Sequence, residues 1–198
     1  ANVLAGAIAK QFPDKFSGST EAGASALRAG LTGLLQEHVY LAGITTGTAL
    51  SGGDFKVPAG ILDANSVALS DAIGGVYGKP AGEQFLALWR KHIGFFVDYT
   101  VATAKNDEAG KDKAAKDLDG YRADFGAFLA SANPNLTKDA VAGALKPHVE
   151  TLFAAIDAQG SKNPDATAKL RTAASHMPDT ANVLAGAIAK QFPDKFSG

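Results

Sequence analysis

Two aspartate–histidine pairs recur at one fixed spacing, and they are the parts of this sequence best suited to do chemistry. Asp63 stands 29 residues before His92, and Asp119 stands 29 residues before His148. A neutral imidazole and a carboxylate form a strong hydrogen bond when buried together, and both are also common ligands of transition metals. The spacing therefore raises two hypotheses, a set of structural pairs or a metal site.

The two ends of the chain carry the same eighteen residues. ANVLAGAIAKQFPDKFSG occupies residues 1–18 and again 181–198. Two origins stay open, an excerpt from an array of 180-residue repeats or a terminal segment copied by engineering. Residues 17–26, SGSTEAGASA, have the composition of a small-residue linker. We therefore divide the chain into a duplicated terminal helix, 1–18, and a helical domain, 19–198.

Apolar residues recur at intervals of three and four around each of the three histidines. One series runs through Phe85, Leu88, His92, Phe96 and Tyr99. This period is typical of amphipathic helices, and the alternating pattern of strands is missing. Helix breakers separate the segments, namely Gly52-Gly53, Gly78 with Pro80, Asn133-Pro134-Asn135, Asn163-Pro164 and Pro178. The sequence predicts an all-α, antiparallel helical bundle of about three helical hairpins.

A hairpin fold would set each aspartate opposite its histidine. Asp63 and Asp119 lie well before the predicted turns and their histidines well after them, so the pairs would meet across the hairpins. The third pair would join Asp179 to His38, 39 residues on when the sequence is continued through the duplicated segment, if the C-terminal copy closes the bundle. If residues 1–18 take that place instead, His38 would face another residue, because that copy lacks Asp179. Because the histidines fall on apolar stripes, the preferred interpretation is structural, a buried imidazole held by a facing carboxylate.

The alternative interpretation is a binding site for a transition metal or a haem in the bundle core. Histidines and carboxylates that project inward are how helical bundles build such sites. The candidate ligands are His38, His92, His148, His176, Asp63, Asp119 and Asp179. The Glu-x-x-His pairs of di-iron bundles and the HExxH motif do not occur.

A set of six aromatic residues, four of them close to His92 in the sequence, favours a packed core. A loosely packed bundle would let them line an apolar pocket beside that histidine. The set is Trp89, Phe95, Phe96, Tyr99, Phe125 and Phe128.

Composition narrows the classes of function. The formal net charge is −1, which provides no basic surface for nucleic acid, and the chain has no cysteine for a disulfide or a thiolate site. No apolar run approaches the ~20 residues of a membrane span. Without a nucleophile–base motif, we expect a non-enzymatic structural or assembly protein that needs no cofactor. Its duplicated helix would permit closure, domain swapping or head-to-tail self-association.

Several phrases of the sequence resemble secreted, repeat-built helical proteins of bacteria. They are EHVYLAG, LWRKHIGFFVDYT, GAFLASANPNL and AIAKQFPDKF, and the resemblance covers most of residues 27–198. It implies a location outside the cell or at its surface. It carries no established activity.

Overall fold

The computed structural model describes residues 2–16, 19 and 22–196, and every regular element in this part of the chain is a helix. The helices, in chain order, are α1 (Asn2–Gln11), α2 (Gly23–Leu50), α3 (Lys56–Tyr77), α4 (Lys79–Lys105), α5 (Glu108–Ala132), α6 (Lys138–Gly160), α7 (Ala166–Ser175), α8 (Met177–Gln191) and α9 (Pro193–Phe196). The prediction of an all-α bundle is confirmed.

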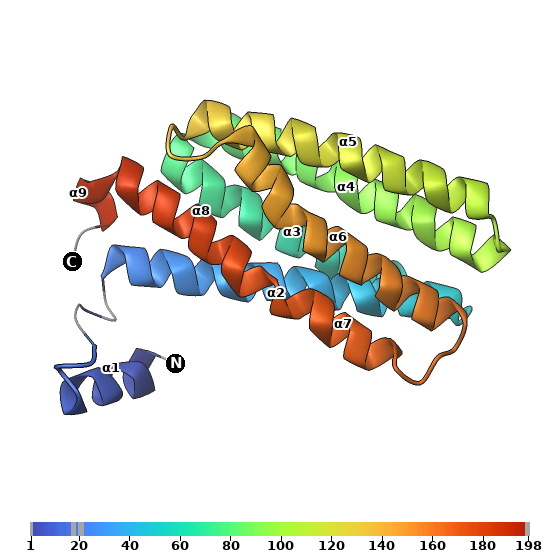
Figure 1. Cartoon of the computed structure of the whole chain (residues 1–198), viewed down its shortest axis with the longest axis horizontal. Helices are drawn as coiled ribbons and strands as arrows, with labels where there is room; N and C mark the ends of the chain where they lie inside the picture. The colour runs from blue at the N-terminus through green and yellow to red at the C-terminus, as the bar shows by residue number, and fades with distance from the viewer. Residues whose placement is uncertain (1, 17–18, 20–21, 197–198) are drawn as a thin grey trace.

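Helices α2 to α6 run up and down, each packed against the next along the chain, as Figure 1 shows. Helices α7 and α8 then cross back over α2, which closes the bundle. Helix α1 lies apart from the bundle, below the first turns of α2 in the same view.

The helix ends fall where the breakers predict them. Gly78 joins α3 to α4 with a φ of 94°, a conformation that glycine adopts without strain. Thr137 begins α6 by accepting a hydrogen bond from the Ala140 amide, a standard N-cap. Pro178 stands in the first turn of α8, where its missing N–H costs nothing.

The predicted linker at residues 17–26 is only partly described. Residues 17, 18, 20 and 21 lie outside the described part of the chain, as do residues 1, 197 and 198 of the duplicated segments. Residues 23–26 are not a linker, because α2 begins at Gly23. Small residues there form a helical turn instead, since the long amphipathic helix continues through them.

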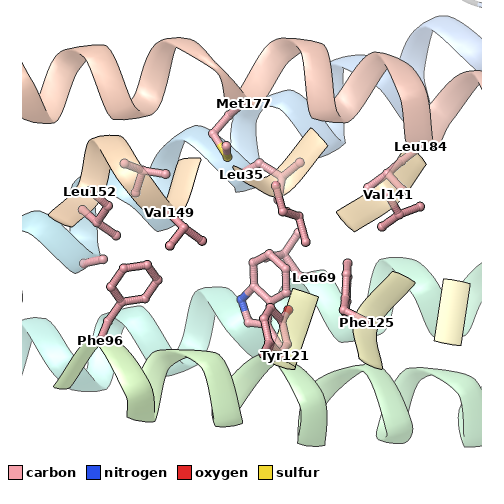
Figure 2. Close-up of a cluster of buried hydrophobic side chains, with 14 of the residues drawn as sticks. Leu35, Leu69, Phe96, Tyr121, Phe125, Val141, Val149, Leu152, Met177 and Leu184 are labelled. Atoms are coloured by element: carbon pink, nitrogen blue, oxygen red, sulfur yellow. The ribbon is translucent and has the colours of Figure 1, made fainter. Parts of the chain in front are cut away.

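One apolar core runs the length of the bundle. Figure 2 shows its side chains directed inward from α2, α3, α4, α5, α6 and α8. Among the least exposed are Leu69, Leu118, Leu152 and Ile156, which lie between neighbouring helices. This core forms one continuous body from α2 to α8, and it positions the buried polar residues described below.

Two glycines of α5 provide a matched test of the packing. A methyl group on Gly126 would collide with the backbone carbonyl of Lys138, where α5 and α6 come close. A methyl group on the exposed Gly120 would meet nothing.

We expect Gly126→Ala to lower the free energy of unfolding by about 1–3 kcal/mol, because backbone cannot yield to the added group. Gly120→Ala should raise it by about 0.5–1 kcal/mol through helix propensity. Urea denaturation of both variants checks this. Equal effects of the two substitutions would contradict the close approach of α5 and α6.

Candidate functional site

Three histidines from three helices meet in the centre of the bundle. His38 lies on α2, His92 on α4 and His148 on α6, with exposed fractions of 1%, 3% and 5%. The Nε2 atoms of His38 and His92 are 3.2 Å apart. One ring nitrogen of each histidine lies within 4.8 Å of one from each of the others. We call these three residues the histidine cluster.

The cluster is enclosed by aromatic rings. Trp89 packs edge-on against His92 with ring centroids 4.5 Å apart, and it also contacts His38 at 4.9 Å. Tyr121 stacks on the other side of His92 at 5.0 Å. Phe96 meets both His92 and His148 at 6.1 Å. The site therefore has a low polarity around its nitrogens.

Burial keeps the three imidazoles neutral. It lowers the pKa of His38 to about 3, with a further contribution from nearby His148. Burial also lowers the pKa of His148 to about 4, and His176 adds to the effect. The pKa of His92 lies well below its usual value, again mainly because the ring is buried. At neutral pH each ring thus has one unprotonated nitrogen, which is the form that a metal ligand requires.

The cluster leaves several buried polar atoms without partners. The Nδ1 atoms of His38 and His148, Trp89 Nε1 and the Tyr121 hydroxyl are buried and make no hydrogen bond within the described chain. A buried polar group without a partner costs about 1–3 kcal/mol, and native proteins contain few of them. These atoms concentrate around one point, which makes the cluster an unusual feature of this core.

The predicted pair of Asp63 and His92 is wrong. Asp63 is half-exposed and accepts two hydrogen bonds from Arg90, at 2.7 and 2.8 Å. These bonds also lower the pKa of the Asp63 carboxyl. The geometric reason is the helical phase, because Asp63 directly follows the buried Leu62 and so points about 100° away from the core.

The predicted pairs of Asp119 with His148 and of Asp179 with His38 are wrong as well. Asp119 is exposed and bonds to Arg122 on its own helix. Asp179 is exposed in the first turn of α8, and the ring that meets His38 is His92. No aspartate belongs to the cluster of possible ligands found among the described residues.

The fourth histidine, His176, is half-buried between α7 and α8. It lies near enough to His148 for its charge to affect the pKa there, but it is not part of the cluster. Three of the seven ligands predicted from the sequence therefore belong to the cluster, and the other four lie elsewhere.

A small cavity of about 20 Å³ adjoins the cluster on one side. His148 and Trp89 form part of its wall, and apolar side chains of α2, α3 and α8, including Leu184, form much of the rest. Such a space holds about one water molecule. Of the three histidines only His148 lines this cavity, and it is far too small for a haem.

The aromatic set predicted near His92 is part of the core and also part of the site. Trp89 and Phe96 contact the histidines, whereas Tyr99 lies further along α4 and stacks on Phe153 at 4.0 Å. Sequence reasoning missed Tyr121. Its place on the apolar stripe of α5, three residues after Leu118, is the signal that could have found it.

No family model, no curated protein and no solved structure matches this chain. No helix in the described part of the chain is long and apolar enough to cross a membrane.

The neutral histidines predict an acid-sensitive stability for the metal-free protein. Below pH 6.5 the unfolded chain takes up protons on these histidines, and the folded chain does not. Stability should therefore fall as the pH decreases from 6.5 to 5, by up to about 1.4 kcal/mol per pH unit for each histidine.

The control is His92→Leu, which removes one of the three groups and should reduce this slope by about a third. Urea denaturation at pH 7, 6 and 5 with a chelator present measures both slopes. The same slope in both proteins would show that His92 is not held neutral in the fold.

Proposed function

We propose that this protein binds a single transition-metal ion at the histidine cluster. The observation that carries the proposal is the convergence of three buried, neutral imidazoles from α2, α4 and α6 with ring nitrogens within 4.8 Å of one another. Three histidine nitrogens with space for one small further ligand form a well-known set for zinc and copper.

The separation of the nitrogens supports one shared ion. Two ligands at about 2.0–2.1 Å from the same metal, in tetrahedral or trigonal geometry, are about 3.3–3.6 Å apart. The Nε2 atoms of His38 and His92, at 3.2 Å, are close to this value. Only His148 would have to move closer, and a side-chain rotation is a small change in a site with an adjoining cavity.

The charge of the site favours a monovalent ion, which among these metals means Cu(I). The cluster has no carboxylate, so the ion would keep its full charge in an apolar environment. The cost of burying an ion rises with the square of its charge, so a divalent ion costs about four times as much as a monovalent one. Cu(I) also accepts three ligands without a fourth.

The proposal is tested by refolding the full chain from urea in the presence of Cu(I), because a buried site in the folded chain would load slowly. Anaerobic conditions keep the copper as Cu(I). Titration against a coloured Cu(I) chelator should give one ion per chain. The melting temperature should rise with the free ion concentration, because the ion binds only the folded state. Zn²⁺ in a parallel titration should bind more weakly.

Two variants separate the cluster from adventitious sites. His92→Leu removes a ligand and should weaken binding by more than the roughly 10–100-fold typical of losing an outer-shell partner. Asp63→Ala alters only an exposed ion pair and should leave binding unchanged. Binding that survives His92→Leu, or no binding by the unaltered chain, would overturn the proposal.

A further inference from the structure

The duplicated segment occupies two different environments in one molecule. Helix α8 buries its apolar face, with Leu184 at 9% exposure and Ile188 at 2%. Helix α1 has the same sequence and exposes the same face, with Leu4 at 68% and Ile8 at 39%. Both helices end at the equivalent glutamine, Gln11 or Gln191. Over these ten shared helical residues the local structure is the same and the docking differs, whereas residues 13–15 form a turn and residues 193–196 form α9.

The surface that holds α8 recognises residues of the duplicated segment. We call it the α8 groove; α2 provides most of it and α6 a smaller part. At its end, Gln191 donates to the Ala132 carbonyl at 3.0 Å and accepts from the Tyr77 hydroxyl at 3.0 Å. Phe192 packs against the Tyr77 ring. Helix α1 ends at Gln11, the equivalent of Gln191, and Phe12 follows it as Phe192 follows α8. Helix α1 could therefore make every one of these contacts.

We propose that α1 also binds the α8 groove of its own chain, displacing residues 181–198. The exposed apolar face of α1 would then be a binding surface whose partner is already in the molecule. Residues 1–180 and residues 19–198 each contain one full set of segments for the bundle.

The chain connection allows this exchange. In the observed fold, Phe196 lies against Gly23 at the start of α2. With α1 in the groove, Phe16 would take the place of Phe196. It precedes Gly23 by seven residues, which can span up to about 23 Å, much more than the contact requires.

The contacts of α8 outside the duplicated segment need not be lost. Met177 and Thr180 are buried at the start of α8, and both precede residue 181. They can stay in place behind α7 while residues 181–198 leave. The exchanged state does break the helix between Thr180 and Ala181, and the backbone hydrogen bonds lost there explain why α8 rather than α1 occupies the groove.

Exchange within one chain is favoured over the self-association that the duplication first suggests. Each chain has two copies of the helix and one groove, so exchange between chains buries no additional surface. A segment of the same chain has an effective concentration in the millimolar range, well above that of a second chain in dilute solution. The partner of α1 is therefore its own bundle.

Matched substitutions of one isoleucine in the two copies test the exchange. Ile188→Asp disfavours α8 in the groove, and Ile8→Asp makes the same change in α1. Ile8→Asp alone should leave the melting temperature unchanged, because α1 is exposed. Ile188→Asp should lower it only in part, and adding Ile8→Asp to that variant should lower it much further. Such non-additivity between the two positions is the signature of competition for one site.

Hydrogen exchange with mass spectrometry shows which copy is docked, since each substitution gives one copy a distinct mass. In Ile8→Asp the residues of α8 should exchange slowly and those of α1 quickly. In Ile188→Asp the order should reverse, with α1 slowed at least about tenfold. The proposal is overturned if α1 stays unprotected, if Ile188→Asp unfolds the chain, or if the protection of α1 appears only in a dimer fraction.

Discussion

Three imidazoles at the centre of an apolar bundle impose the condition that the rest of the structure has to meet. They stay there only while uncharged, because a buried cation without a counter-charge is strongly unfavourable. Apolar and aromatic side chains close around them, and no carboxylate of the described residues belongs to the cluster. The same closure keeps the rings neutral, and neutral imidazoles are the form in which histidine could act as a metal ligand.

The order of the helices brings the histidines together. Because α2 to α6 run up and down, α2, α4 and α6 enter the centre from different sides, with α3 and α5 between them along the chain. Polar contacts then fix both ends of the bundle. At one end Tyr77 links Asn133 to Gln191, and at the other Asp157 binds the Tyr99 hydroxyl and Lys111, each at 3.0 Å. With both ends held, the central rings have little freedom to separate.

The sequence was informative wherever one residue decides the outcome locally. Breakers predicted the helix ends, because a turn depends on a few neighbouring residues, and the cap at Thr137 is a local feature of the same kind. The apolar period correctly placed the three histidines in the core. The predicted partners of these histidines were wrong because the spacing along a hairpin gives the position of a residue along each helix but not the face of the helix on which it lies. In a real helix Asp63 follows Leu62 and Arg90 follows Trp89, so both charges turn outward together and pair there.

The convergence of the histidines could not be read from any single hairpin. His38, His92 and His148 meet only after three hairpins pack, and that arrangement depends on the sum of many apolar contacts. The duplicated ends posed a different difficulty. Two identical helices have the same propensity and the same apolar face, so nothing in the sequence of α1 or α8 alone decides which one docks. What decides it is the helical connection from Thr180 to Ala181 within α8, which the exchanged state breaks.

The α8 groove and the histidine cluster share a wall. Leu184 of α8 and Met177 line the same small cavity as His148 and Trp89. In the proposed exchange, Leu184 leaves the cavity together with residues 181–198. The side of the cluster that faces the cavity then stays uncovered until a leucine fills the cavity again. Leu4 of α1 is the residue that would take its place. If the cluster binds an ion as proposed, exchange of the covering helix would supply a route of entry without unfolding the bundle. The duplicated segment and the cluster would then be connected through the position of this one leucine.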